Sequence, residues 1–293
     1  MVVSWGMRDL LLAAVQMTVT DDVDANLAQA RARCEEAIDA GAHLIALPEN
    51  FSGIARNGAP PPLVCDPRNL AETAEMAAFF EMSSRFSGLL ILGGQPLAAP
   101  DGRHHNACLV LQSGRLVARY DKIHRFHATM PDGSLLTEVQ TTAPGDRPVV
   151  VDWNGVRVGL GICYDLRFPE HYRALASAEA HILLGPSAFT FATGAAHWSL
   201  LLRARALENQ AYMVAPAQDG HHAPGRQSWG HSMVVGPWGE ILAQQAHGSG
   251  LAMAWARAET LRGVRRALPC LEHRTLGPET TAEVVTLKGC GSP

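Results

Sequence analysis

Lysine is nearly missing from this chain of 293 residues: Lys122 and Lys288 are its two lysines among 24 basic residues. The 28 acidic residues outnumber the basic ones, the formal net charge is −4 at pH 7, and we find no patch rich in lysine or arginine. This charge balance argues against a nucleic-acid-binding protein, which concentrates positive charge on one surface. It also makes Lys122 informative, because a chain that uses arginine nearly everywhere keeps a lysine there.

Paired cysteines and long apolar runs are missing as well. The six cysteines form no C-x-x-C pair and no regular spacing, which in a chain of this length predicts the reduced thiols of a cytoplasmic protein. No apolar run approaches the roughly 18 residues of a membrane-spanning helix. The beginning, MVVSWGMRDLLLAAVQM, has too short an apolar run for a signal peptide and predicts a core strand, with Met7 as an alternative start.

Recognised metal and nucleotide patterns are also lacking. The 13 histidines include three close pairs, which are His104-His105, His124/His127 and His221-His222. None matches H-E-x-x-H or a Cys/His zinc spacing, so we predict no metal site. Gly159-Leu160-Gly161 lacks the third glycine of a dinucleotide-binding fingerprint, so we predict no nucleotide cofactor.

Apolar runs typical of strands alternate with amphipathic helical patterns, which indicates an α/β protein. We expect helices at residues 24–39, 69–85, 169–178 and 197–210. We expect strands at residues 10–15, 43–47, 89–92, 107–111, 116–120, 149–153, 156–162, 181–184 and 212–215. Turn signals at Ser113-Gly114, Asn154-Gly155 and residues 237–239 predict three hairpins.

The chain shows no internal repeat and no linker. We therefore predict a single domain over residues 1–275. A tail at 276–293 loses the apolar pattern, and we expect it to be disordered or to cover a partner subunit. Residues 122–146 lack clean periodicity and are expected to form an active-site loop.

One cysteine stands at the end of an apolar strand, in the sequence GLGICYDLRFPE at residues 159–170. Alternating apolar residues precede Cys163, and Pro169 favours the first turn of a following helix. Cys163 is therefore expected at a strand-to-helix corner, where a side chain faces a pocket and backbone N–H groups stay free. A thiol there is a candidate nucleophile; the structural alternative is a small core residue.

Glu49 and Lys122 also follow apolar strands directly. Because strand ends converge on the ligand crevice of an α/β sheet, both side chains can meet Cys163 there. Glu49 would take the thiol proton and later return it to the leaving amine. Lys122 would favour the thiolate and stabilise an oxyanion together with the backbone N–H of Tyr164. Taken singly, Glu49 could be a cap and Lys122 a surface charge, but three such strand ends together predict a catalytic set.

These residues carry a resemblance to the nitrilase (carbon–nitrogen hydrolase) superfamily over about residues 10–274. LIALPEN, YDKIH and GICYDLRFPE resemble the segments of the family's glutamate base, lysine and nucleophile, which map to Glu49, Lys122 and Cys163. PSAFTFATGAAHW, LLRARALENQAY and GHSMVVGPWGE resemble the amidase branch that includes ω-amidase and deaminated glutathione amidase. Glu138 matches a second family glutamate that orients the lysine and water; without the resemblance it would be read as a solvated loop residue.

The resemblance implies an α/β fold of the αββα sandwich type, with four layers, no metal and no organic cofactor. It also implies a thioester intermediate on Cys163. Family members assemble through faces of the sandwich, so we expect a homodimer or a higher homo-oligomer. The helix at 197–210 suits such an interface, although core packing would explain its apolar side equally well.

Four further residues are candidates for substrate binding. Arg167 lies four residues past the nucleophile and could hold a substrate carboxylate, with an ion pair to Glu170 or Asp165 as the structural alternative. Phe189 and Thr193 resemble the family's substrate-lining positions, and Tyr164 adjoins the nucleophile.

Some positions depart from the family pattern. Arg125 and His127 stand where relatives commonly carry an apolar residue and an acid, which bears on the substrate and not on the chemistry. Gly236 replaces a frequent aspartate. The stretch from His221 to Arg226 resembles the deaminated glutathione amidase pattern more than that of ω-amidase.

We therefore predict a cytoplasmic amidase that hydrolyses a linear amide of a small (keto) dicarboxylate, with a small-molecule amide substrate and neither nucleic acid nor membrane as a partner. The alternative within the superfamily is a nitrilase or an N-carbamoyl amidase. A catalytically silent binding protein is a further alternative, against which the intact set of Glu49, Lys122 and Cys163 argues.

Overall fold

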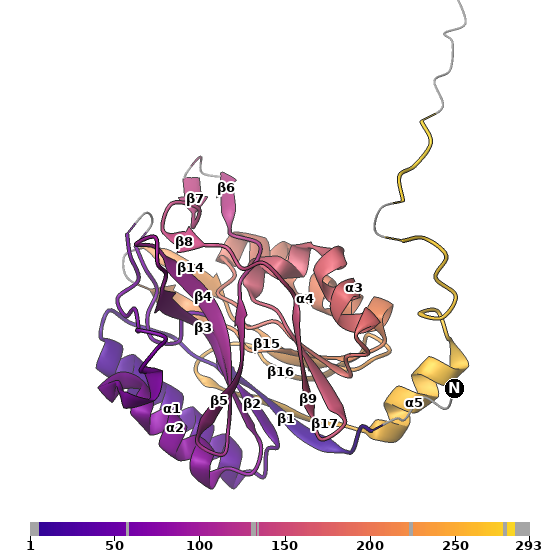
Figure 1. The fold of residues 1–293 in the computed structure, drawn as a ribbon, viewed down its shortest axis with the longest axis horizontal. Coiled ribbons are helices and arrows are strands. Elements are labelled where there is room, and N and C mark those ends of the chain that lie inside the picture. The colour runs from indigo at the N-terminus through magenta and orange to yellow at the C-terminus, as the bar shows by residue number, and fades with distance from the viewer. Residues whose placement is uncertain are drawn as a thin grey trace, which may run out of the picture.

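Two β-sheets face each other in this computed structural model, and helices cover both outer faces (Figure 1). The structure describes residues 6–56, 59–129, 133, 135–222, 225–277 and 280–284. The first sheet has the strand order β17-β1-β2-β3-β4-β5, with β8 paired to β4, and the second has the order β16-β15-β12-β11-β10-β9. The predicted αββα sandwich is thus the observed architecture, formed as one domain.

The first sheet joins parallel strands in its centre to antiparallel strands at its edges. Its members are β1 (Leu10–Gln16), β2 (Leu44–Ala46), β3 (Leu89–Ala98), β4 (His104–Gln112), β5 (Arg115–Asp121), β8 (Thr142–Ala143) and β17 (Gly250–Ala256). Its outer face packs against α1 (Val23–Asp39) and α2 (Ala74–Arg85). Strand β1 shows why: Ala13 and Val15 pack toward the helices, while Leu12 and Ala14 pack in the core between the sheets.

The second sheet is built in the same way. Its strands are β9 (Val149–Trp153), β10 (Val156–Leu160), β11 (Ile182–Leu184), β12 (Tyr212–Ala215), β15 (Ser232–Val235) and β16 (Ile241–Gln245). Helices α3 (Pro169–Ser177) and α4 (Phe191–Asn209) pack on its outer face. The turn between β9 and β10 is the predicted one, because Asn154 and Gly155 both have positive φ, 52° and 84°.

Smaller elements complete the fold. They are the 3₁₀ turns η1 (Leu70–Glu72) and η2 (Cys163–Arg167), the hairpins β6 (His127–Thr129) with β7 (Leu135–Thr137) and β13 (Asp219–His222) with β14 (Arg226–Trp229), and helix α5 (Ala258–Ala267). The β6–β7 hairpin projects from one end of the sandwich, at the top of Figure 1.

Three predicted segments need correction. The helix expected at 69–85 is interrupted at Thr73, whose backbone is extended, so that η1 precedes α2. Helix α4 begins at Phe191 and not at residue 197, because the Thr190 side chain accepts a hydrogen bond from the Thr193 N–H and caps it there. The expected loop at 122–146 contains β6, β7 and β8. The first two are largely exposed and β8 is a buried strand of two residues, so all three are too short to show an apolar alternation in the sequence.

The described cysteines, Cys34, Cys65, Cys108, Cys163 and Cys270, are free thiols, and Cys290 lies outside the described residues. Across the described ranges, no helix combines the length and apolar character needed to cross a bilayer. Of the predicted tail, residues 276–277 and 280–284 are described and form neither helix nor strand. The rest of that prediction lies outside the described residues.

Candidate active site

The candidate nucleophile lies at the corner between β10 and η2. Cys163 has a φ of 46°, in the left-handed region that non-glycine residues seldom occupy. Its N–H donates to the Pro186 carbonyl at 2.9 Å, and 8% of the residue is exposed. A non-glycine residue held in this conformation is typical of functional sites, where the surrounding structure imposes the backbone geometry.

Lys122 lies between two carboxylates. Its Nζ donates to Glu49 Oε1 at 2.8 Å and to Glu138 Oε2 and Oε1 at 2.9 and 3.1 Å. The lysine side chain is fully buried, whereas that of Glu138 is 28% exposed. Burial lowers the pKa of Lys122, but the charges of Glu138 and Glu49 outweigh it and raise that pKa well above the usual value. The site therefore holds a permanent buried ammonium.

Glu49 is the buried carboxylate of the set. Its Oε1 also accepts a hydrogen bond from Asn106 Nδ2 at 2.9 Å, and its Oε2 accepts one from the Ala188 N–H at 3.0 Å. Burial raises the pKa of Glu49, but the charge and hydrogen bond of Lys122, with a hydrogen bond from the Cys163 thiol, hold it below its usual value. Glu49 is thus an ionised acceptor in contact with the thiol.

The surroundings of Cys163 favour the thiol over the thiolate. Burial and the Glu49 carboxylate raise its pKa, and the opposing effect of Lys122 is smaller. The expectation that Lys122 favours the thiolate therefore has the right sign, but desolvation outweighs it. A nucleophilic thiolate would have to form during attack, by transfer of the proton to Glu49.

One pocket collects the candidate residues. Its walls are formed by Glu49, Phe126, Glu138, Cys163, Tyr164, Arg167, Ala188, Phe189, Thr190, Thr193 and Arg226. Every site residue predicted from the sequence lines this pocket except Lys122, which contacts both Glu49 and Glu138.

The Arg167 side chain contacts two aromatic side chains, Phe189 and His197. Its guanidinium carbon lies 5.3 Å from the centroid of the Phe189 ring, and Nη1 lies 3.2 Å from His197 Nδ1. Over the described chain, it makes no ion pair with Glu170 or Asp165, the structural alternative considered above. This leaves its positive charge at the pocket, beside the buried Phe189.

Several pocket or supporting residues were missed by the sequence analysis. Phe126 lies in the segment read as a loop, and its N–H donates to Glu138 Oε2 at 3.0 Å. Arg226 was noted only within a family-like stretch; its Nη2 donates to the Ala188 carbonyl at 3.2 Å, and its charge contributes to the lowered pKa of Glu49. Asn106 left a usable signal, since this polar residue directly precedes the apolar run at residues 107–111.

The departures at Arg125 and His127 lie outside the pocket lining. Arg125 Nη1 donates to the carbonyls of Val139 and Thr142 at 3.1 and 3.3 Å, and His127 Nδ1 lies 2.9 Å from Thr137 Oγ1. Both residues therefore support the segment that carries Glu138.

Gly236 also has a local explanation. A Cβ at this position would lie 2.2 Å from Glu240 Oε1. The other oxygen of Glu240 accepts a hydrogen bond from the Trp238 N–H at 3.1 Å. The glycine thus leaves room for the Glu240 carboxylate to close the turn.

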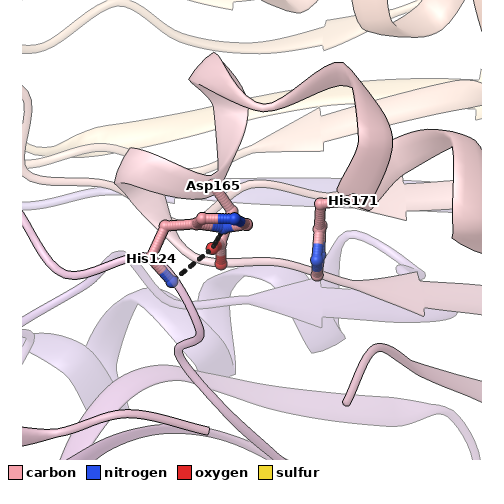
Figure 2. Close-up of side chains that lie close together, drawn as sticks. All are labelled: His124, Asp165 and His171. Atoms are coloured by element: carbon pink, nitrogen blue, oxygen red, sulfur yellow. Dashed lines mark hydrogen bonds and ion pairs between the residues drawn. The ribbon is translucent and has the colours of Figure 1, made fainter. Parts of the chain in front are cut away.

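One group of metal-ligand side-chain types lies together within the described ranges, namely His124, Asp165 and His171, with ligand atoms inside 4.8 Å of one another (Figure 2). The two oxygens of Asp165 already accept hydrogen bonds from Tyr120, Ile162 and His124. A metal ion would have to displace these donors, so the residues fit a hydrogen-bonded network better than a metal site.

A two-sheet sandwich that places a thiol, a carboxylate and an ammonium in contact has the groups that a cysteine-dependent hydrolase requires. The family model for carbon–nitrogen hydrolases matches residues 11–266. The chain is 38% identical over 278 residues to a deaminated glutathione amidase of Synechocystis, covering 92% of this chain and 99% of the relative. It is 40% identical over 273 residues to the deaminated glutathione amidase of Homo sapiens, covering 90% and 82%.

A solved structure agrees. The NitFhit protein of C. elegans superposes with a TM-score of 0.82 at 34% identity, covering 92% of this chain and 66% of that one. The chain therefore belongs to the carbon–nitrogen hydrolase family. The fold and the class of enzyme predicted from the sequence, a hydrolase of carbon–nitrogen bonds, are confirmed.

Proposed function

We propose that the protein is an amidase that cleaves the ω-amide of a small keto-dicarboxylate through a thioester at Cys163. The observation that carries the proposal is the contact of the Cys163 thiol with an ionised Glu49 that also binds Lys122. Relatives named deaminated glutathione amidase, and one named omega-amidase from Arabidopsis thaliana, support the substrate class.

The first half of the reaction is acyl transfer to sulfur. Cys163 Sγ attacks the amide carbon as its proton passes to Glu49, and the C=O electron pair moves to oxygen. The Lys122 ammonium and the Tyr164 backbone N–H stabilise this oxyanion. When it collapses, the C–N bond breaks, Glu49 returns the proton to nitrogen, and ammonia or an amine leaves.

The second half is hydrolysis of the thioester. Glu49, again ionised, removes a proton from water, whose oxygen attacks the acyl carbon. The C–S bond breaks, the carboxylic acid is released and the proton restores the thiol. Glu138 holds Lys122 through both carboxylate oxygens and is itself held by the Phe126 N–H, which suits it to orient the ammonium and the water.

Two cations suit the pocket to anionic substrates. Arg167 and Arg226 both line it, and a guanidinium binds a carboxylate through two parallel hydrogen bonds. Tyr164, Phe189 and Thr193 complete the surface around them. An α-keto acid that ends in an amide, such as α-ketoglutaramate or deaminated glutathione, places a carboxylate and a scissile amide in one small molecule.

The test is release of ammonia or amine from a panel of α-keto ω-amides, nitriles and ureido acids. We expect turnover of the amides. Turnover of a nitrile or a ureido acid with none of the amides would overturn the substrate class and favour a nitrilase or an N-carbamoyl amidase. No turnover of any substrate by a folded enzyme would favour a binding protein.

We further propose that the chain self-associates through the outer face of α4. Leu200 and Leu207 on this helix are 70% and 54% exposed, and Trp238 is 55% exposed. Leu200 and Leu207 lie two turns apart on one face of α4, and Leu207 packs beside Gly239, the neighbour of Trp238. Exposed apolar side chains that lie together in this way mark contact surfaces. Light scattering should show a dimer or larger assembly that Leu200→Glu dissociates, and a wild-type monomer would refute the proposal.

A further inference from the structure

We infer that Asp165 is a positioning residue, whose buried carboxylate ties the segment carrying Lys122 to the segment carrying Cys163 and so sets the approach of ammonium to thiol. The inference rests on the function proposed above for these two residues. It concerns a residue two positions past the nucleophile that does not line the pocket.

The contacts of Asp165 come from both segments. Oδ2 accepts from the Tyr120 hydroxyl at 2.7 Å and from the Ile162 N–H at 2.8 Å. Oδ1 lies 2.8 Å from His124 Nδ1 and accepts from the His124 N–H at 3.2 Å. Tyr120 and His124 flank Lys122 on either side, and Ile162 precedes Cys163. A single carboxylate thereby bridges the end of β5 and the start of η2.

The carboxylate is buried and charged. Asp165 has no exposed surface. Burial raises its pKa, but the hydrogen bond from His124, the neighbouring His171 and the donors at Ile162 and Tyr120 hold that pKa below its usual value. A buried charge satisfied from several directions fixes its donors in place, because moving any of them leaves a polar group unpaired.

The donors are themselves held by rings. The His124 ring stacks on Phe168 at 3.7 Å between centroids, with planes 8° apart. His171 packs edge-on to His124 at 6.1 Å and lies 5.4 Å from the Tyr120 ring. Its Nε2 lies 2.9 Å from the Leu160 carbonyl at the end of β10. Figure 2 shows His124 bonded to Asp165, with His171 standing beside the pair.

Loss of this carboxylate should therefore lower kcat more than it changes KM. The residues that would hold the substrate, such as Arg167 and Phe189, make no contact with Asp165 among the interactions described. Lys122 and Cys163, in contrast, each lie within two residues of a donor to the Asp165 carboxylate, namely Tyr120 and His124 for Lys122 and Ile162 for Cys163. A displacement of about 1 Å in a catalytic group can cost roughly 10²-fold in rate.

The test compares Asp165→Asn and Tyr120→Phe with Tyr172→Phe as a matched control. Tyr172 is also a fully buried tyrosine, but its hydroxyl donates to the Leu184 carbonyl at 3.0 Å and not to Asp165. We expect Asp165→Asn to lower kcat about 10²-fold with KM nearly unchanged, and Tyr120→Phe to lower kcat about tenfold. Tyr172→Phe should leave kcat unchanged.

A second readout does not depend on the substrate. The rate at which iodoacetamide alkylates Cys163, followed by peptide mass spectrometry against pH, reports the surroundings of the thiol. Asp165→Asn and Tyr120→Phe should shift this profile, and Tyr172→Phe should not. Adding Tyr120→Phe to Asp165→Asn should cause little further loss, because both remove one network.

The inference fails if Asp165→Asn keeps the wild-type kcat, if it changes KM alone, or if the alkylation profile is unmoved. Equal losses from Tyr120→Phe and Tyr172→Phe would also overturn it, and that comparison decides even where Asp165→Asn does not fold. A wild-type enzyme inactive on every amide would refute the proposed function instead, and the alkylation profiles would still test Asp165.

Discussion

Replacing Glu138 by glutamine probes how the buried ammonium is shared. Glu49 and Glu138 compete for one Lys122 side chain, so each carboxylate weakens the hold of the ammonium on the other. Glu138→Gln keeps an oxygen that can accept from Nζ and from the Phe126 N–H but removes the charge. The charge of Lys122 is then no longer partly neutralised by a second carboxylate, so the pKa of Glu49 should fall further below its usual value.

The magnitude follows from burial. Breaking a fully buried ion pair costs about 3–5 kcal/mol, but Glu138 is 28% exposed and Lys122 retains Glu49. We therefore expect Glu138→Gln to lower the free energy of unfolding by about 1–2 kcal/mol, which corresponds to a Tm lower by roughly 2–8 °C. A lower pKa makes Glu49 a weaker base. Because a positioned base accelerates a reaction by roughly 10²–10⁴-fold, we expect kcat/KM to fall about tenfold.

The assay is the pH dependence of kcat/KM for an α-keto ω-amide, beside thermal unfolding. The acidic limb, where Glu49 becomes protonated, should move to lower pH and the plateau should fall. Glu170→Gln, which removes an exposed carboxylate on α3, should change neither. An acidic limb that stays in place or moves to higher pH would refute the reasoning about shared charge.

Three other predictions follow from the same site. Cys163→Ser should abolish measurable amide turnover in a folded protein, since a hydroxyl is a far weaker nucleophile beside Glu49; retained velocity would exclude the thioester. Arg167→Met should raise KM for anionic amides about tenfold or more and much less for neutral amides, and equal effects would contradict the carboxylate contact. The folded pKa of Glu49 lies below its ordinary 4.5, so the stability that this group contributes is present above pH 4.5 and is lost as pH falls through the lower folded value. In urea unfolding, the free energy of unfolding of Glu49→Gln should therefore fall less steeply with decreasing pH than that of the wild type. An equal dependence on pH in both proteins would contradict this prediction.

Local patterns in the sequence predicted much of the sandwich. Alternation along β10 and the Asn154-Gly155 turn depend on neighbouring residues alone, and both were predicted correctly. The first turns of α4 were missed because Gly194 weakens the helical pattern. The structure supplies its reason, since a Cβ at Gly194 would lie 2.2 Å from Trp229 Cβ, in a contact between segments far apart in the chain.

The site was predictable only in part, because some of its contacts also join segments that lie far apart in the chain. Glu49, Lys122 and Cys163 each follow a strand, which local pattern can indicate, and the structure brings them into contact. Glu138 was identified only through the family resemblance, since its place beside Lys122 depends on the β6–β7 hairpin, next to which Glu138 pairs with Phe126. Arg226 reaches the pocket, and Tyr120 and His124 reach Asp165, only through tertiary packing. The sequence around these residues carries no local signal of those contacts.

The raised pKa of the buried Cys163 thiol has a consequence for its oxidation. Peroxides attack thiolates far faster than thiols, so burial beside the Glu49 carboxylate, which raises this pKa, should slow oxidation of the sulfur. We therefore expect the Cys163 thiol to withstand peroxide longer than the sulfur of a cysteine enzyme that keeps it ionised.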